Sequence, residues 1–249
     1  MKKVKIYFLL AGFLISIPAF AQKWKLSRSE VGGGIGVANY FGDIGGAEQS
    51  KMLGFGDIDM ENTRFSIAGY YRYRIYERFS IKGGINYARM HGADKNSANE
   101  SRNYAFSTNL YELYGQVEYH ITEEKQMVTY NAMSLRGKLK KINAEINFYA
   151  FLGIGGAYFK STPLESFETS TRYVGDKNMS FIVPVGLGLK YPLTPKTSLG
   201  LEIGRRFILT DYIDGFSPEQ SESRDTYYFT VINVSYKLER KAKRPEYRF

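Results

Sequence analysis

Residues 64–87 read RFSIAGYYRYRIYERFSIKGGINY, and they contain the clearest alternation of side-chain types in the sequence. From Phe65 to Ile75 apolar or aromatic side chains occupy alternate positions, and mostly small, polar or cationic side chains lie between them. The same alternation returns from Phe79 to Tyr87 after a tight connection. A period of two is that of a β-strand, so the stretch predicts a hairpin with one apolar and one polar, cationic face.

The length of these strands indicates their surroundings. Strands of soluble proteins are usually about 5 to 6 residues long, whereas a tilted strand that crosses a bilayer needs roughly 9 to 11. Aromatic residues at the strand ends are typical of the girdles at a membrane interface. The hairpin therefore predicts a transmembrane β-barrel.

Residues 1–21 have the pattern of a signal peptide. Lys2, Lys3 and Lys5 precede an apolar run at 6–17, and Ala-Phe-Ala at 19–21 is a small-x-small cleavage signal. We therefore expect export and a mature chain that begins at Gln22. The apolar run is too short for a spanning helix.

Composition and charge restrict the classes of chemistry and of partner that the protein can have. The mean hydropathy of −0.34 is compatible with a barrel, because half of each strand is polar. The content of 21 Tyr, 17 Phe and 25 Gly suits strands with aromatic ends. The absence of Cys excludes disulfides and thiol catalysis. Removing the three signal-peptide lysines from the formal charge of +9 leaves +6. Because the chain is exported, we expect no nucleic acid partner, but anionic outer-membrane lipid and lipopolysaccharide, or an acidic protein.

The alternation predicts an all-β fold, an eight-stranded antiparallel up-and-down transmembrane β-barrel with a filled interior. We expect residues 22–29 to be a short lead, 30–238 the barrel and 239–249 a basic periplasmic tail.

The strand at 145–159 is apolar on both faces, and we expect its even positions to meet lipid. Pro184 cannot donate to a β-ladder and predicts a bulge or local break. The expected strands lie at 30–40, 64–75, 79–88, 109–119, 145–159, 181–191, 198–207 and 227–238.

The connections predict the orientation. Four are long (41–62, 91–106, 160–178 and 211–225), and those after the second and sixth strands are short. Outer-membrane barrels have long external loops and short periplasmic turns, so we expect both termini in the periplasm.

The segment 120–143 should be a short periplasmic turn but is long and basic. With the tail, it predicts a docking surface for a partner. Two solvated, flexible segments are an equally good interpretation. The candidate partner-binding residues are Arg136, Lys138, Lys140, Lys141, Arg240, Lys241, Lys243 and Arg244.

An eight-stranded barrel is just wide enough for side chains to fill it, so we do not expect a solute channel. Charged residues on spanning strands must point inward. The sequence thus predicts a buried, structural network of ion pairs in the barrel interior. Its candidate members are Arg72, Arg74, Lys82, Glu112, Glu118, Lys190, Glu202 and Arg206.

Catalytic and metal-binding motifs are weak. His91 and His120 are the only histidines, and neither lies in a recognisable motif. The acids at 57, 59 and 61 lack the spacing of a calcium loop. The glycines at 32–36 precede no helix and so do not predict a phosphate loop. We expect no enzyme, no cofactor and no metal site.

Three motifs carry a family resemblance: EVGGGIG at 30–36, NYFGDI at 39–44 and FLGIGG at 151–156. With the signal peptide, they resemble the PorG-type outer-membrane protein of the type IX secretion system, over the whole mature chain. The resemblance implies a small barrel that ties a periplasmic ring, made by a lipoprotein and its partner subunit, to the outer membrane. It thereby implies a role in protein secretion and, in gliding species, in the export of surface adhesins. It implies no catalytic residues.

Two alternatives to this function stay open. One is a stand-alone outer-membrane barrel that acts as an adhesin or envelope stabiliser through its outer loops. The other is a soluble exported barrel that binds a small ligand, against which the apolar bands and aromatic strand ends argue.

Overall fold

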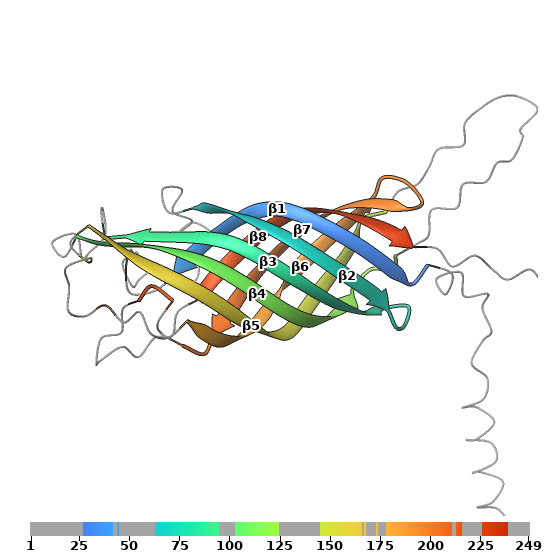
Figure 1. Ribbon diagram of the computed structural model, residues 1–249. Helices are drawn as coiled ribbons and strands as arrows, with labels where there is room; N and C mark the ends of the chain where they lie inside the picture. The colour runs from blue at the N-terminus through green and yellow to red at the C-terminus, as the bar shows by residue number, and fades with distance from the viewer. Residues whose placement is uncertain are drawn as a thin grey trace, which may run out of the picture.

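The computed structural model describes residues 27–41, 44, 63–94, 103–124, 145–165, 167, 173, 178–210, 213–215 and 226–238. These form one closed antiparallel barrel in which each strand pairs with the next and β8 pairs with β1 (Figure 1). No helix in the described ranges is long and apolar enough to cross a membrane. The strands are β1 (Ser29–Phe41), β2 (Arg64–Arg74), β3 (Phe79–Ala93), β4 (Tyr104–His120), β5 (Asn147–Glu165), β6 (Met179–Pro192), β7 (Thr197–Ile208) and β8 (Thr226–Leu238).

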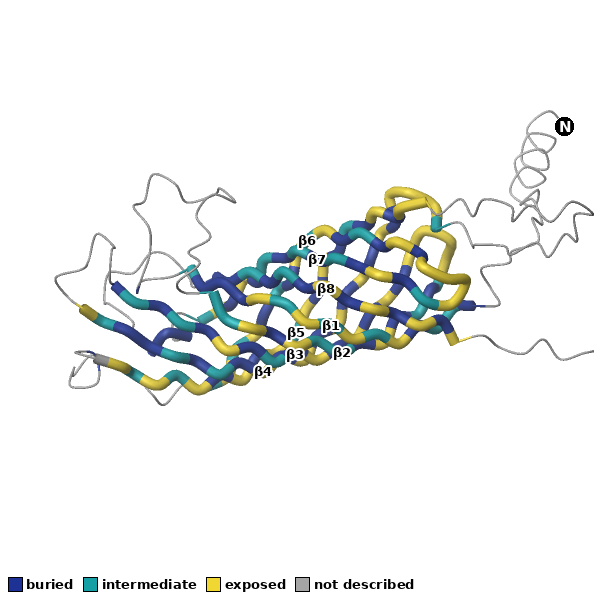
Figure 2. The backbone as a smooth tube through the Cα atoms, turned by 90° about the horizontal axis from the view of Figure 1, so that it is seen from above, coloured by how far each residue is buried: buried dark blue, intermediate teal, exposed yellow. Residues whose placement is uncertain are grey.

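The outward face of the barrel is apolar. Ile35, Leu113 and Ile154 point away from the interior and expose 71%, 68% and 75% of their surface. Buried and exposed residues alternate along the strands (Figure 2). An exposed apolar band of this extent is unfavourable in water and favourable against lipid chains.

Two rows of aromatic residues border this band. Toward one end, the ring centres of Tyr87 and Tyr111 lie 5.0 Å apart and those of Tyr111 and Tyr158 lie 6.4 Å apart. Toward the other end, Phe79 and Tyr119 lie 5.2 Å apart. Phe79 and Tyr87 are separated by about 26 Å along β3, or roughly 20 Å along the barrel axis at a tilt of ~40°. This height is close to that of the apolar band of outer-membrane barrels.

The two ends of the barrel differ. At one, the hairpin end, β1 begins, β8 ends, and short turns at 75–78 and 193–196 join β2 to β3 and β6 to β7. At the opposite end, the loop end, β3, β4 and β5 extend beyond their neighbours (Figure 1). Both described chain ends thus lie at the hairpin end, where Ser29 pairs with Leu238.

The sequence prediction was wrong about the ends of these three strands. β3 continues to Ala93, β4 begins at Tyr104 and β5 continues to Glu165, so parts of the expected loops 91–106 and 160–178 are strand. The outward positions there are largely polar. These parts of the strands therefore lack the apolar outward face from which a membrane strand is predicted. Backbone pairing nonetheless continues along β3, β4 and β5.

Two finer predictions are confirmed. The even positions of β5 face outward, as Phe148 and Leu152 show, while Tyr149 and Phe151 are buried. The β5–β6 ladder is interrupted opposite Pro184: it pairs Leu152 with Val185 and resumes, in the same register, at Gly155 and Ile182. Pro184 therefore causes a local break without a bulge, because its nitrogen has no proton to donate.

Candidate functional site

The interior toward the hairpin end is filled by ion pairs. Arg72 of β2 is almost fully buried, and its Nε lies 2.6 Å from Glu118 of β4. The same guanidinium lies 3.3 Å from Glu30 of β1 and 3.4 Å from Glu202 of β7. Arg72 thus joins carboxylates from three strands, which a guanidinium can do because its five N–H donors point in several directions.

Lys82 of β3 and Glu202 form the next pair across the barrel. The Lys82 ammonium donates to both Glu202 oxygens at 2.6 Å, and the Tyr149 hydroxyl donates to one of them, also at 2.6 Å. Lys82 Nζ also lies 4.1 Å from the centre of the Tyr70 ring. Each charge is paired and hydrogen-bonded, which burial in a low-dielectric interior requires.

A smaller polar group lies around Glu112 of β4. Its carboxylate accepts hydrogen bonds from the Tyr227 hydroxyl and, at 2.8 Å, from Asn86. Arg206 Nε lies 3.8 Å from the same carboxylate, and the Arg206 guanidinium carbon lies 4.7 Å from the centre of the Phe229 ring. The eight residues expected in the interior, Arg72, Arg74, Lys82, Glu112, Glu118, Lys190, Glu202 and Arg206, are all buried, and each has an ion-pair partner.

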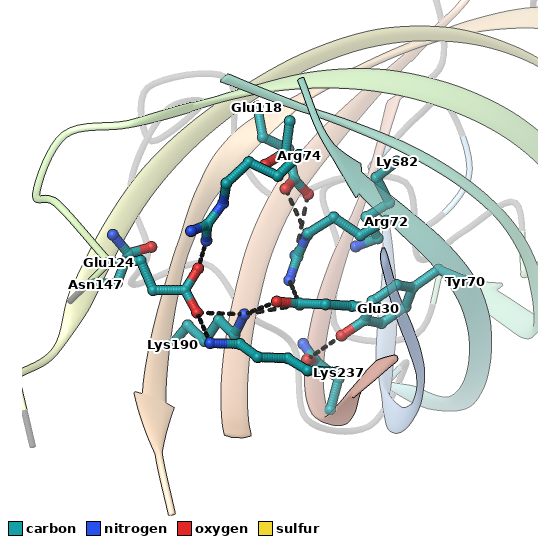
Figure 3. A network of polar contacts seen from close by, with 12 residues as sticks. Glu30, Tyr70, Arg72, Arg74, Lys82, Glu118, Glu124, Asn147, Lys190 and Lys237 are labelled. Carbon is teal, nitrogen blue, oxygen red and sulfur yellow. Dashed lines mark hydrogen bonds and ion pairs between the residues drawn. The ribbon is translucent and has the colours of Figure 1, made fainter. Parts of the chain in front are cut away.

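The mouth of the barrel at the hairpin end is closed by Glu124, which follows β4. Its carboxylate lies 3.0 Å from Lys190 and 2.6 Å from Lys237 and also pairs with Arg74, so that cations of β6, β8 and β2 converge on it (Figure 3). The Glu124 side chain is only 5% exposed. Lys190 also donates to Glu30 at 2.6 Å, which links this cluster to Arg72.

Sequence reasoning missed three members of this network. Glu30 and Lys237 lie at strand ends, with the same parity as their inward neighbours, and that parity could have identified them. Glu124 lies in a connection without periodicity, so no sequence pattern indicated its position.

Other contacts hold the residues around Glu124 in place. The Thr122 carbonyl accepts a hydrogen bond from the Asn147 amide, and the Thr122 hydroxyl accepts one from the Phe148 backbone at 2.8 Å. Glu123 pairs with Arg78 of the β2–β3 turn at 2.8 Å, and this hydrogen bond raises the pKa of the Arg78 guanidinium. The start of the long connection after β4 is therefore fixed to the barrel.

The interior toward the loop end is apolar. Phe106, Leu110, Phe159 and Phe229 belong to one buried cluster, which Ile44, Phe167 and Ile213 join from outside the strands. Residues 213–215 are hydrogen-bonded to three strands: Tyr40 donates to the Asp214 carboxylate at 2.8 Å, Thr108 to the Ile213 carbonyl at 2.8 Å and Ser161 to the Asp214 carbonyl at 3.1 Å. Chain segments thus lie across both ends of the barrel.

One set of contacts resembles a hydrolase triad. His120 Nε2 lies 3.0 Å from the Ser80 hydroxyl, and His120 Nδ1 lies 2.7 Å from Asn147 Oδ1. A nucleophile, a base and an orienting group need these distances. Ser80 and His120 are however 0% exposed within the filled interior. No substrate reaches the hydroxyl in this arrangement, and the contacts connect β3, β4 and β5.

The remaining candidates are placed as follows. His91 lies half-buried on the outward face of β3, away from His120. No group of three or more His, Asp and Glu side chains in the described ranges could hold a metal ion. The candidate calcium acids at 57, 59 and 61 lie outside the described residues, as do the partner-binding candidates Arg136, Lys138, Lys140, Lys141, Arg240, Lys241, Lys243 and Arg244.

A closed barrel of eight long strands, apolar outside and filled inside, defines an integral outer-membrane protein. Residues 7–239 match the outer membrane protein beta-barrel domain, and the chain belongs to this family. No curated protein sequence matches it.

The fold is similar to that of several solved barrels. Neisserial surface protein A is 13% identical over 84% of this chain and 97% of its own, with a TM-score of 0.45. Ail, the attachment invasion locus protein of Yersinia pestis, is 13% identical over 85% and 99%, with a TM-score of 0.42. OprG of Pseudomonas aeruginosa is 12% identical over 86% and 97%, with a TM-score of 0.41.

Proposed function

We propose that this protein is a non-enzymatic outer-membrane component of the type IX protein secretion machinery. In this role it tethers the periplasmic ring lipoprotein and its partner subunit to the outer membrane, in support of secretion and, in gliding species, of motility. The motifs at 30–36, 39–44 and 151–156 support the proposal through their resemblance to the PorG-type barrel.

One structural observation carries the docking role. Glu124 is the last described residue before 125–143, the basic part of the segment 120–143, and a single residue, Leu238, separates Lys237 from the basic tail 239–249. The two side chains pair at 2.6 Å. The described residues next to the two basic segments, Glu124 and Lys237, therefore lie beside each other although they are far apart in the sequence. This supports a docking surface for an acidic partner to which both segments contribute.

The connections support one orientation of the barrel in the membrane. The two short turns lie at the hairpin end, and outer-membrane barrels have short turns in the periplasm. We therefore propose that the hairpin end faces the periplasm and that both termini and the basic segments lie on that side. The filled interior supports a structural role over solute transport.

The test is a pull-down in mild detergent of the tagged protein from its native outer membrane, followed by mass spectrometry. Recovery of the ring lipoprotein and its partner subunit is the expected result. Recovery of the barrel alone, in detergent that keeps the ring intact, would contradict the tether.

Charge variants test the docking residues in the same assay. The variant Lys140→Gln/Lys141→Gln should reduce recovery of the ring proteins. The matched control Lys95→Gln/Arg102→Gln removes the same charge from the connection between β3 and β4, at the opposite end of the barrel, and should leave recovery unchanged. Equal recovery of the ring proteins with the wild type, the Lys140→Gln/Lys141→Gln variant and the control would exclude Lys140 and Lys141 from the interface.

A second candidate function is that of a stand-alone adhesin or envelope stabiliser. The extension of β3, β4 and β5 beyond the other strands at the loop end favours it, because it gives the barrel an exposed external wall (Figure 1). A barrel that is recovered alone but is required for attachment or envelope integrity would support this candidate instead.

A further inference from the structure

Charged side chains are rare on the outward face of the barrel. Within the described strands, the charged residues at outward-facing positions are Arg89, Lys160 and Arg205. All three are cations, and all three lie toward the loop end of their strands. A charge on the lipid-facing surface is unfavourable unless it reaches the head groups, so a one-sided set of cations requires an explanation.

Two of these cations lie in one row across three strands. Arg89 of β3 pairs in register with Asn109 of β4, and Asn109 pairs with Lys160 of β5. Adjacent strands are about 4.8 Å apart, so the backbones of Arg89 and Lys160 are separated by roughly 10 Å. Two long side chains can bind one group from positions at this separation.

This row lies directly beyond the aromatic row. Tyr87, Tyr111 and Tyr158 pair in register two residues closer to the hairpin end. The Tyr87 hydroxyl donates to Asn109 Oδ1 at 3.2 Å. Head groups lie just beyond the aromatic girdle of a membrane barrel, so the row lies at head-group level.

Contacts within the barrel position the guanidinium groups. Arg89 Nε donates to the Ser107 hydroxyl at 3.1 Å. Arg205 Nη2 donates to the Thr226 hydroxyl at 3.2 Å, and the Arg205 guanidinium carbon lies 4.7 Å from the centre of the Phe207 ring. Each of these hydrogen bonds uses one N–H of a guanidinium that has five. Both arginines are therefore oriented and keep further N–H donors for an anion.

We propose that Arg89, Lys160 and Arg205 bind phosphate groups of an anionic glycolipid in the outer leaflet. Arginine binds phosphate through two parallel hydrogen bonds, and lysine adds a point charge. The row of Tyr87, Tyr111 and Tyr158, which lies closer to the hairpin end, offers an apolar surface to the acyl chains and sugar of the same lipid. The choice of the outer leaflet rests on the orientation proposed above, whereas the site itself does not depend on the secretion role.

The experiment is native mass spectrometry of the detergent-solubilised protein, titrated with a bisphosphorylated lipid A-type glycolipid. The wild type is compared with Arg89→Gln/Lys160→Gln, with Arg205→Gln, and with the control Arg78→Gln/Lys196→Gln at the hairpin end. A Lys or Arg at an anionic lipid surface contributes about fivefold to affinity, so the double variant should bind roughly 25-fold more weakly. Arg205→Gln should bind about fivefold more weakly, and the control should bind as the wild type does.

Chemical controls distinguish the source of the phosphate. The dephosphorylated glycolipid should bind as weakly to the wild type as the phosphorylated lipid binds to the double variant. Equal affinity for phosphatidylglycerol, or displacement of the lipid by millimolar inorganic phosphate, would overturn the assignment to a glycolipid. Unchanged affinity of both variants would overturn the site. No secretion protein is present in this assay, so its result is independent of the pull-down.

Discussion

Glu124 offers the sharpest test of the closed barrel mouth. The substitution Glu124→Gln preserves the shape of the side chain and removes its charge. Its partners Arg74, Lys190 and Lys237 are 6%, 3% and 7% exposed, so solvent does not replace the lost carboxylate. Lys190 keeps Glu30 at 2.6 Å. Arg74 and Lys237 lose the carboxylate that pairs with each of them.

Removing one partner of a buried ion pair costs about 3–5 kcal/mol, and we expect a loss of this size for Glu124→Gln. The assay is reversible urea unfolding of the barrel in lipid vesicles. Unfolding is monitored by far-UV circular dichroism and by gel mobility. The adjacent Glu123→Gln is the matched control, because the side chains of Glu123 and Arg78 are 49% and 46% exposed. It should unfold at the wild-type midpoint.

Two outcomes would be incompatible with a buried Glu124 cluster. Equal midpoints for Glu124→Gln and Glu123→Gln would show that the mouth is open to water. The double variant Glu124→Gln/Lys237→Met removes one of the orphaned cations and should recover part of the loss. A double variant less stable than Glu124→Gln would mean that Lys237 is stabilised by something other than this carboxylate.

Four further predictions concern the interior. Lys82→Met leaves Glu202 without its closest cation and should cost about 3–5 kcal/mol in urea unfolding, and Lys82→Met/Glu202→Gln should recover part of this loss; an unchanged midpoint for Lys82→Met would contradict the pair. Gly34→Ala would place a methyl group 2.5 Å from the Ile232 carbonyl, whereas at Gly33 it would lie 3.4 Å from its nearest neighbour. Gly34→Ala should therefore destabilise the barrel by about 1–3 kcal/mol, and Gly33→Ala should not. Equal unfolding midpoints for the two variants would mean that Gly34 does not lie this close to the Ile232 carbonyl. The purified protein should give no discrete current steps in planar bilayers, because side chains fill the interior, and regular steps would mean an open pore. A fluorophosphonate probe should not label buried Ser80, and labelling that His120→Ala abolishes would instead indicate a hydrolase.

Much of the fold could be predicted because the barrel has two chemically different faces. Phe79, Ile81 and Ile85 had to face lipid, and Lys82 between them had to face inward, so period two alone oriented the hairpin. The filled interior followed from strand number. The far ends of β3, β4 and β5 could not be predicted, because their outward face is largely polar and resembles a loop.

The organisation of the interior was only partly predictable. Parity shows that Arg72 and Glu118 point inward, but the partner of each charge depends on strand register and shear, which hydropathy does not determine. Glu124 shows the limit most clearly. It lies outside any strand, yet it pairs with cations from three strands, and only the closed barrel brings these together.

We proposed above that the hairpin end faces the periplasm and that a basic segment there binds a partner, and single-cysteine labelling tests both points. The chain has no cysteine, so single-cysteine variants report without background. Lys140→Cys lies in the basic segment, and Thr162→Cys lies at an exposed position near the loop end of β5. In intact cells, a membrane-impermeant maleimide should label Thr162→Cys only, and a thiol-activated photocrosslinker at Lys140→Cys should join the barrel to the ring lipoprotein or its partner subunit. Labelling of Lys140→Cys from outside the cell would mean that the hairpin end is external. The absence of any crosslinked ring protein would mean that the basic segment does not bind the ring.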